Sequence, residues 1–330
     1  MVGQVNFRGI LSQPILVTSG VPQGSHLGPL LFDFFLIDLS DYFPDDFFHA
    51  IFADDTKFGR VISSDEDAQA LQNQINIFSQ WCIDNGMSLN ASKCCNMTFS
   101  RKSRIINWEY SVNGSTMKRV SEIRDLGVIL DPKLEYNSHI ESICCKGYNM
   151  LAFIKRQAKQ FNNMWVTQTL YYTLVRSILE YASVIWMPYK KKYIDEIESI
   201  QKQFLLFALK HIYDREYGFS LPSYASRLKM INMESLQNRR ELLCASFVFD
   251  VLTNVIRVPH IKDSINYNPS SRRNRHTELL QVRNFGSKWS NDEVLNRCAV
   301  IFNKYSHLFD SNITKQTFKD RVKKWQLQLD

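Results

Sequence analysis

Two adjacent carboxylates, Asp54 and Asp55, interrupt the apolar stretch IFADDTKF at residues 51–58. Like charges side by side repel, and burying either one is costly unless a cation lies between them. Two short apolar runs around a tight acidic turn predict a β-hairpin. Carboxylates at its tip could coordinate Mg²⁺, and two such ions can assist phosphoryl transfer. A solvated acidic turn is the alternative, and this stretch alone favours it.

A second candidate element precedes the hairpin. The segment SGVPQGSHLGPLLF at residues 19–32 concentrates glycine and proline in a turn before an apolar run, GPLLFDFFLIDLSDYF, that reads as a mostly buried helix. Glycines let a backbone come close to a ligand, while Gln23 and Ser25 offer hydrogen bonds there. A Gly/Pro loop that simply precedes a core helix is the alternative.

The composition fits a globular protein with a charged partner. The chain has 330 residues, 45% hydrophobic and 22% charged, with a formal net charge of +7. Acidic segments lie early, whereas YKKKY, SSRRNRH and FKDRVKKW lie late. This pattern suggests metal-dependent work on a charged polymer, although solvated surfaces give similar counts. The seven cysteines show no zinc or disulfide spacing, and no signal peptide or membrane-spanning run is present, so an intracellular protein is expected.

The elements that must position these residues divide into three sections. Residues 1–122 mix strands and helices, with a helix after Ser64 or Asp65 that ends at Gly86 and a hairpin turn at Asn113–Gly114. Residues 123–215 open with a strand pair around Gly127 and then turn helical. Residues 216–330 continue helical, pass through a polar loop near 262–290 that is expected to be flexible, and end in a short helix.

Two helices of the second section show apolar residues at helical spacing. The expected core positions are Leu170, Leu174, Ile178 and Ile185 in one helix, and Ile194, Ile197, Ile200 and Phe204 in the other.

Taken in order, these motifs resemble the palm of reverse transcriptases from non-LTR retrotransposons, the LINE-type, jockey-like group. The glycine/proline segment and the Phe-Ala-Asp-Asp tetrad at 52–55 carry the resemblance. Downstream, WCIDNGMSLNASKCCNMTFS and IRDLGVILDPKLEYNSHI look like the family's next segment and its primer grip. The resemblance covers nearly the whole chain and is most specific over residues 19–140.

The resemblance implies roles for individual residues. Asp54 is implied as the catalytic Mg²⁺ ligand and Asp55 as a second, less essential one, while Lys93 is either a general acid near the triphosphate or a surface lysine. His139 matches in position, but a helix-capping or core histidine is the favoured interpretation. The implied nucleotide- and template-binding residues are Gly20, Pro22, Gln23, Gly24, Phe52 and Ala53, and the implied primer grip is Leu126, Gly127 and Val128.

The implied fold is α+β. A partial polymerase palm, an antiparallel sheet with packed helices, would occupy residues 1–122. The primer-grip hairpin and helical thumb would follow at 123–215, and a basic, mostly helical C-terminal region at 216–330. The implied function is RNA-directed DNA synthesis on an RNA template and DNA primer with dNTP and Mg²⁺, or Mn²⁺ in its place. The family also suggests the nucleus, and no membrane association is expected.

The chain also departs from the family. The family's first metal ligand is an aspartate on a strand well upstream of the glycine/proline segment, but the residues before Ser19 contain no Asp or Glu. Asp33 and Asp38 are poor substitutes, and Asp38 has a structural position. The fingers and endonuclease would also lie upstream. The isolated chain is therefore expected to be inactive or severely crippled, with apolar sheet surface exposed.

Two other functions remain open from the sequence. The basic thumb and the SSRRNRH segment could make the chain a non-enzymatic nucleic-acid-binding remnant of a transposable element, whose affinity would fall steeply with salt. A helical protein–protein module is the third alternative, supported by the amphipathic stretch at 193–209 alone.

Overall fold

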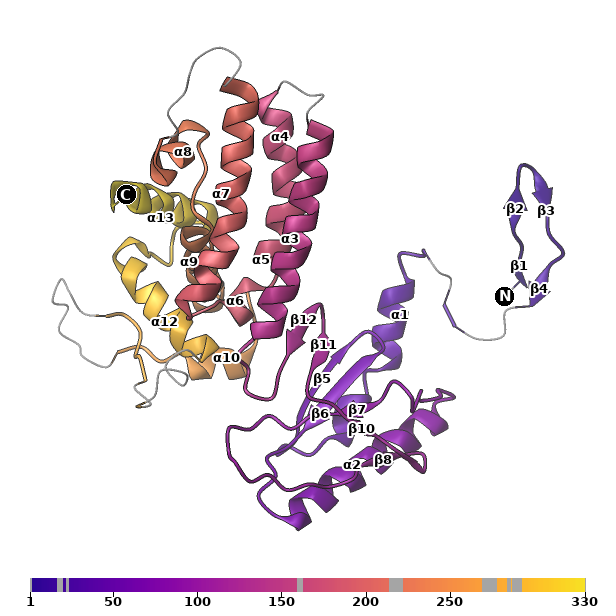
Figure 1. Ribbon diagram of the computed structural model, residues 1–330. Helices are drawn as coiled ribbons and strands as arrows, with labels where there is room; N and C mark the ends of the chain where they lie inside the picture. The colour runs from indigo at the N-terminus through magenta and orange to yellow at the C-terminus, as the bar shows by residue number, and fades with distance from the viewer. Residues whose placement is uncertain are drawn as a thin grey trace. The chain divides into compact units, whose positions relative to one another are not determined.

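The computed structural model describes residues 2–16, 20–21, 24–158, 163–213, 222–268, 278–283, 286 and 293–329. The chain forms two compact units, Met1–Ser121 and Glu122–Asp330, here called the N-terminal and C-terminal units. Short strands and helices mix in the first unit, and helices dominate the second (Figure 1), which confirms the expected α+β class. The division of the second unit into thumb and C-terminal region stays a prediction.

The described strands form six two-stranded sheets in place of the expected continuous antiparallel sheet. Five pairs are antiparallel: β1 (Val2–Gly3) with β4 (Ile15–Leu16), β2 (Asn6–Phe7) with β3 (Ile10–Leu11), β5 (Phe48–Phe52) with β6 (Asp55–Gly59), β8 (Ser111–Val112) with β9 (Ser115–Thr116), and β11 (Ile123–Asp125) with β12 (Val128–Leu130). The sixth pair, β7 (Cys95–Asn96) with β10 (Lys118–Arg119), is parallel. Parallel strands need a long connection, and the β8–β9 hairpin lies within it.

Local sequence chemistry fixes the helix of the N-terminal unit. The helix α2 (Asp65–Asp84) follows the N-cap residue Ser64, whose side chain accepts a hydrogen bond from the Asp67 backbone N–H. In turn, the Asp67 side chain accepts a hydrogen bond from the Ser64 backbone N–H. This reciprocal pair, a capping box, satisfies backbone donors that the first helical turn leaves free. At the other end, Gly86, at φ 68°, follows the last turn of the helix. The predicted cap and stop are both confirmed.

The prediction of a mostly buried helix after the glycine/proline segment is wrong. The helix α1 (Gly28–Phe35) is followed by a 3₁₀ turn, η1 (Leu39–Tyr42). Leu36, Leu39 and Phe43 pack against Trp81 of α2 on one side. On the other side the side chains of Leu30, Phe34 and Ile37 are 64%, 70% and 69% exposed. The described residues cover only one face of this segment, and this leaves an apolar surface of the kind that marks a docking face.

The C-terminal unit is a helical assembly. Its helices α3, α4 and α7 run side by side (Figure 1). The helical elements among the described residues are α3 (Asn137–Gln157), α4 (Met164–Tyr171), the π-helical η3 (Tyr172–Arg176), α5 (Ser177–Glu180), α6 (Ser183–Trp186), α7 (Lys191–Tyr213), α8 (Tyr224–Met230), α9 (Leu236–Leu252), α10 (Pro259–Ser264), α12 (Val294–Tyr305), η4 (Ser306–Leu308) and α13 (Lys315–Leu329).

The apolar stripe of the α4–η3–α5 segment lies one residue away from the predicted one. Tyr171, Val175 and Leu179 are fully buried, whereas the predicted positions Leu170, Leu174 and Ile178 are only partly buried beside them, and Ile185 is 42% exposed. The π-helical turn η3 lies within this segment. In contrast, Ile197, Ile200 and Phe204 of α7 are buried as predicted, with Ile194 half-buried.

The last section contains more regular secondary structure than expected where it is described. The α10 helix extends to Ser264, and Tyr267 forms a β-bridge with Leu280, whose side chain is fully buried. Residues 269–277 lie outside the described part, so the predicted flexibility there stays a prediction. Two helices, α12 and α13, end the chain in place of one. All seven cysteines are free, and none of the described helices is long and apolar enough to cross a membrane.

Candidate active site

The β5–β6 hairpin places the two aspartates. Phe52 pairs with Asp55, so Ala53 and Asp54 form a two-residue turn. Ala53 has φ 50°, a left-handed conformation that costs a residue with a Cβ about 1–2 kcal/mol. The predicted hairpin is confirmed. It holds Asp54 in the turn itself and Asp55 at the first position of the returning strand.

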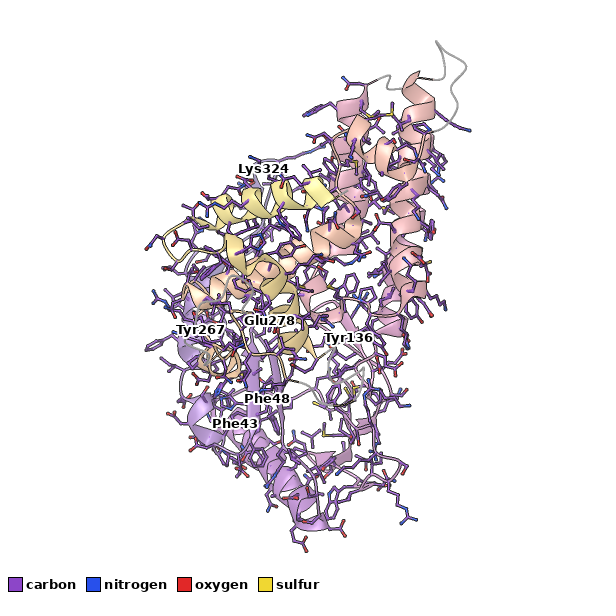
Figure 2. The ribbon with its side chains drawn as sticks, turned by 90° about the vertical axis from the view of Figure 1, so that its left-hand side faces the viewer. Phe43, Phe48, Tyr136, Tyr267, Glu278 and Lys324 are labelled. Atoms are coloured by element: carbon purple, nitrogen blue, oxygen red, sulfur yellow. The ribbon has the colours of Figure 1, made fainter. Side chains whose placement is uncertain are left out.

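The hairpin has one packed and one open face. His49 stacks on Phe43 with centroids 4.8 Å apart, and Phe58 lies against the same ring. Phe48 and Phe52 point to the opposite face, where they are 68% and 61% exposed (Figure 2 labels Phe43 and Phe48). Cross-strand partners share a face, so Asp55 lies on the open face beside Phe52. The open face is therefore the one that carries an acid next to an aromatic ring.

The chemistry of the turn suits a divalent cation only in part. Asp54 and Asp55 are both exposed, so their carboxylates are accessible from solvent. Mg²⁺ in proteins is often held by one or two carboxylates, with water and substrate phosphates completing its shell. Among the described residues, however, no group of three or more His, Cys, Asp or Glu side chains could hold a metal ion. The hairpin thus offers part of a coordination shell.

Asp38 does not contribute to this shell. Its carboxylate accepts a hydrogen bond of 3.4 Å from the Trp81 indole N–H, and its neighbour Leu39 is buried in the core. The bond anchors the segment after α1 to α2, which agrees with the structural position expected for Asp38.

The glycine/proline segment is described only at some of its positions. Gly20 and Gly24 have φ of 87° and 80°, conformations that favour glycine over any residue with a Cβ. Among the described residues, and apart from the glycine's own chain neighbours, no atom lies within 4 Å of where a Cβ would stand on either glycine. The described residues therefore leave space for a ligand to approach the backbone at both positions. Pro22 and Gln23 lie outside the described residues, and the nucleotide-binding role of this segment stays a prediction.

Lys93 lies in a turn before β7. Its backbone N–H donates to the Asn90 carbonyl at 3.0 Å, and the Asn90 side chain accepts from the Ser92 backbone N–H at 3.1 Å. The Lys93 side chain is exposed, and within the described part of the chain no hydrogen bond or ion pair joins it to the β5–β6 hairpin. Its catalytic role stays a prediction.

The predicted primer grip is a tight hairpin turn. Asp125 pairs with Val128, and the two residues between them, Leu126 and Gly127, have φ of 43° and 88°. Positive φ at both central positions is the requirement of a type I′ turn. The Tyr181 hydroxyl donates to the Leu126 carbonyl at 2.9 Å, and a Cβ on Gly127 would lie 3.1 Å from the Tyr181 ring. Tyr181 therefore holds this turn. The sequence offered no local signal for it, because 55 residues separate it from Leu126.

Gly127→Ala is expected to destabilise this turn by about 2 kcal/mol, because alanine is strained at φ 88° and its methyl group would press on the Tyr181 ring. Tyr181→Phe should cost about 1 kcal/mol through the lost hydrogen bond. Urea unfolding measures both, with Gly59→Ala as the control because nothing lies within 4 Å of its Cβ position and its φ is ordinary. Equal losses for Gly127→Ala and Gly59→Ala would contradict this account.

His139 is a core residue. Its side chain is 3% exposed, and its Nδ1 accepts a hydrogen bond of 3.2 Å from the Ile129 backbone N–H. The ring meets Trp186 edge-on, with centroids 5.2 Å apart. Burial, together with the positive charges of Arg124 and Lys146, lowers the pKa of His139 from 6.5 to about 4. The favoured interpretation of a core histidine is confirmed.

This lowered pKa predicts a pH dependence. The unfolded chain takes up a proton at His139 near pH 6.5, whereas the folded chain does so only near pH 4. The stabilisation is therefore complete above pH 6.5 and is lost on acidification toward pH 4, by on the order of 3 kcal/mol. Urea unfolding of wild type and His139→Asn across this range isolates the contribution. The two proteins should show different pH slopes, and parallel slopes would contradict the prediction.

Comparison with known proteins identifies the region that holds these elements. The family model described as reverse transcriptase (RNA-dependent DNA polymerase) matches residues 2–130. These residues belong to the reverse transcriptase family. The match includes the Phe52–Asp55 tetrad and the Leu126–Gly127 turn, which lie in the N-terminal and C-terminal units respectively.

The relatives of this reverse transcriptase region come from mobile elements, which confirms the non-LTR retrotransposon group. An RNA-directed DNA polymerase from mobile element jockey of Drosophila funebris is 34% identical over 149 residues, 42% of this chain and 16% of the relative. Probable RNA-directed DNA polymerases from transposon BS and transposon X-element of Drosophila melanogaster are 27% and 28% identical, over 64% and 60% of this chain and 24% and 22% of theirs. The matched parts thus span a quarter or less of each relative. No solved structure matches the chain.

Proposed function

We propose that this chain forms part of an RNA-directed DNA polymerase of a non-LTR retrotransposon, acting on an RNA template, a DNA primer and dNTP. The observation that carries the proposal is the β5–β6 hairpin, which exposes Asp54 and Asp55 beside Phe52 inside the region that matches the reverse transcriptase family. In this reaction the primer 3′-oxygen attacks the α-phosphorus of the dNTP, and pyrophosphate leaves.

The residues would divide this work between them. Asp54 and Asp55 would hold Mg²⁺, which when bound offsets the negative charge that develops on the phosphoryl oxygens. The ring of Phe52, exposed on the same face, would form the floor beside the primer end. The Leu126–Gly127 turn, held by Tyr181, would position the primer terminus. Gly20 and Gly24 would leave the backbone accessible to the nucleotide or templating base.

We further propose that the isolated chain has little or no activity. Two metal ions need carboxylates that converge from more than one strand. The described residues offer only the two acids of one hairpin and no larger cluster of metal ligands.

Primer extension on poly-rA with an oligo-dT primer tests both statements. The isolated chain with Mg²⁺ or Mn²⁺ should incorporate little dTTP, and robust incorporation that Asp54→Ala abolishes would overturn the inactivity. A chimera, in which this chain's segment replaces the similar 149-residue region of the jockey polymerase, should be active. An inactive but folded chimera that still binds primer–template would argue against the polymerase assignment.

A further inference from the structure

The β5–β6 hairpin that carries Asp54 and Asp55 packs on one side only. Ile51 and Phe58 on its packed face join the core formed with α2, where the rings of Phe58 and Phe78 lie 5.5 Å apart. The opposite face of β5 is exposed. Apolar contacts are not directional, so they bury the strands without fixing their tilt. A directional contact is therefore needed to set where the turn points.

Arg60 supplies such a contact at the base of the hairpin, the end opposite the turn. It directly follows β6, and its Nη2 atom lies 3.2 Å from Asp46 Oδ2 and 3.0 Å from Asp67 Oδ1. Asp46 precedes β5, whereas Asp67 lies in the first turn of α2. The guanidinium also lies over the Phe47 ring, 5.1 Å from its centroid. Arg60 therefore joins the two segments that flank the hairpin to each other and to α2.

The Asp67 carboxylate is itself fixed by the chain around it. Its Oδ2 accepts hydrogen bonds from the Ser63 and Ser64 backbone N–H groups at 2.8 Å and 3.1 Å, while its Oδ1 accepts from Arg60. The Arg60 and Asp67 side chains are 19% and 25% exposed, whereas Asp46 is 59% exposed. Water therefore screens the pair with Asp67 less. Because charge-assisted bonds of this kind are directional, that pair is the main link between hairpin and helix.

The length of the hairpin amplifies small movements at its base. Each strand has five residues and is about 17 Å long, so a tilt of about 3–4° at the base moves the turn by about 1 Å. Misplacing a catalytic group by about 1 Å can lower a rate about 100-fold. A contact that fixes the base to within a few degrees is therefore enough to affect chemistry at the turn.

We propose that Arg60 is a positioning residue for Asp54 and Asp55, acting through the tilt of the β5–β6 hairpin on α2. Helix capping does not account for Arg60, because Ser64 and Asp67 complete the capping box between themselves. The effect of Arg60 on rate rests on the proposed polymerase function, whereas its effect on the tilt does not.

Rates in the jockey chimera test the positioning role. Arg60→Gln should lower kcat for single-nucleotide incorporation at least about tenfold and leave the affinity for primer–template within about twofold, because misplaced acids affect the chemical step. Arg60→Lys, which keeps the charge but lacks the planar fork, should have an intermediate kcat. A kcat for Arg60→Gln within about twofold of wild type would overturn the proposal.

Gln72→Ala is the matched control for a general loss of stability. Gln72 ties α2 to β8 through two hydrogen bonds of 2.8 Å with the Ser111 backbone, and in the described part of the chain it has no such bond to the β5–β6 hairpin. This variant should lower the urea midpoint about as much as Arg60→Gln but leave kcat within about twofold. If Gln72→Ala lowered kcat as much as Arg60→Gln, reduced stability would explain both and the positioning role would be wrong.

The tilt is measured in the isolated chain, whether or not that chain is active. Residual dipolar couplings of the backbone N–H groups report the orientation of β5 and β6 relative to α2. Arg60→Gln should change this orientation or widen its range by several degrees, whereas Gln72→Ala should not. Unchanged couplings in Arg60→Gln would overturn the proposal. If the couplings change but the wild-type chimera incorporates no nucleotide, the polymerase assignment fails and the orienting role of Arg60 stands.

Discussion

Asp54→Asn is expected to reduce primer extension by the jockey chimera on the order of 10³-fold, because it removes a metal-binding charge while keeping the shape of the side chain. Asp54 lies in the turn itself, and the described residues offer no group of three or more metal-ligating side chains that could compensate for the loss of its carboxylate. Single-nucleotide incorporation with saturating Mg²⁺ measures the effect on the chemical step.

Neighbouring acids supply the comparison for this prediction. Asp55→Asn should lower the rate by a smaller factor, about 10-fold, if its carboxylate assists from the open face of the hairpin. Asp45→Asn, an exposed acid in the turn before β5, should leave the rate within twofold. If Asp54→Asn and Asp45→Asn lowered the rate by comparable factors, the loss of any negative charge in this region, rather than the loss of a metal ligand, would explain the effect.

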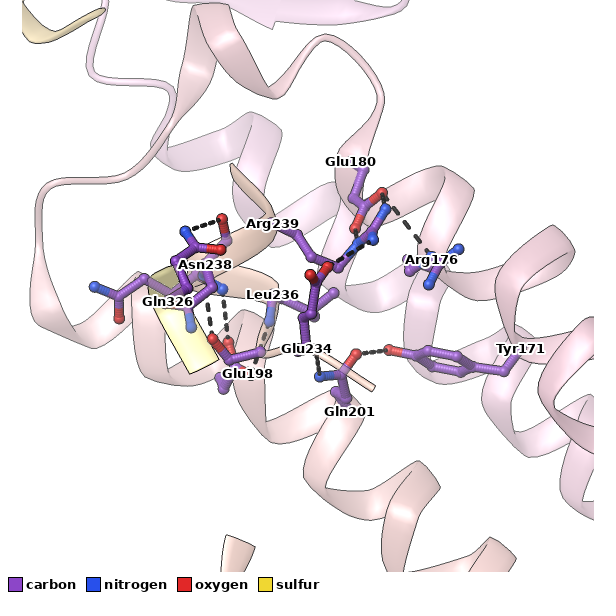
Figure 3. Close-up of polar contacts among 12 residues, drawn as sticks. Tyr171, Arg176, Glu180, Glu198, Gln201, Glu234, Leu236, Asn238, Arg239 and Gln326 are labelled. Atoms are coloured by element: carbon purple, nitrogen blue, oxygen red, sulfur yellow. Dashed lines mark hydrogen bonds and ion pairs between the residues drawn. The ribbon is translucent and has the colours of Figure 1, made fainter. Parts of the chain in front are cut away.

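Glu180→Gln is expected to destabilise the C-terminal unit by about 3 kcal/mol. Glu180 at the end of α5 accepts hydrogen bonds from both Arg239 Nε and Nη2 on α9, the latter at 2.9 Å, and lies 3.9 Å from Arg176 (Figure 3). The Glu180 and Arg239 side chains are only 14% and 20% exposed. Removing one charge of such a pair leaves the other poorly solvated, which costs more than the pair itself contributes.

A surface pair provides the matched control for Glu180→Gln. Lys191 and Asp195 of α7 are 2.9 Å apart, but their side chains are 78% and 51% exposed. Asp195→Asn should therefore cost at most about 0.5 kcal/mol. Urea unfolding, with hydrogen exchange of α5 and α9 peptides to locate the change, measures both variants. A loss below 1 kcal/mol for Glu180→Gln would contradict the role given to this pair.

Local elements of this fold could be predicted because their causes are local. The Ser64 cap acts on residues within one helical turn, and Asn113 and Gly114 adopt the positive φ that their two-residue turn requires. The same holds for the Leu126–Gly127 turn and for the hairpin that carries Asp54. Each depends on residues a few positions apart, whose conformational preferences follow from their residue types.

Which residues are buried was harder to predict, because burial depends on which elements pack against a segment. The apolar run after Gly28 has the composition of a core helix, yet Leu30 and Phe34 are exposed. In the segment from α4 to α5 the buried stripe passes through Tyr171, Val175 and Leu179, one position from the predicted one. Periodicity gives the presence of an apolar face, and the packing partners decide which residues it includes.

The sequence by itself determined the reverse transcriptase motifs and the hairpin that exposes Asp54 and Asp55, since these depend on residue type and short-range spacing. Only the tertiary structure decided that Tyr181 holds the Leu126–Gly127 turn and that Arg60 joins the base of the β5–β6 hairpin to α2. These contacts join separate elements, and which elements meet is set by the packing of helices and strands, which no local preference encodes.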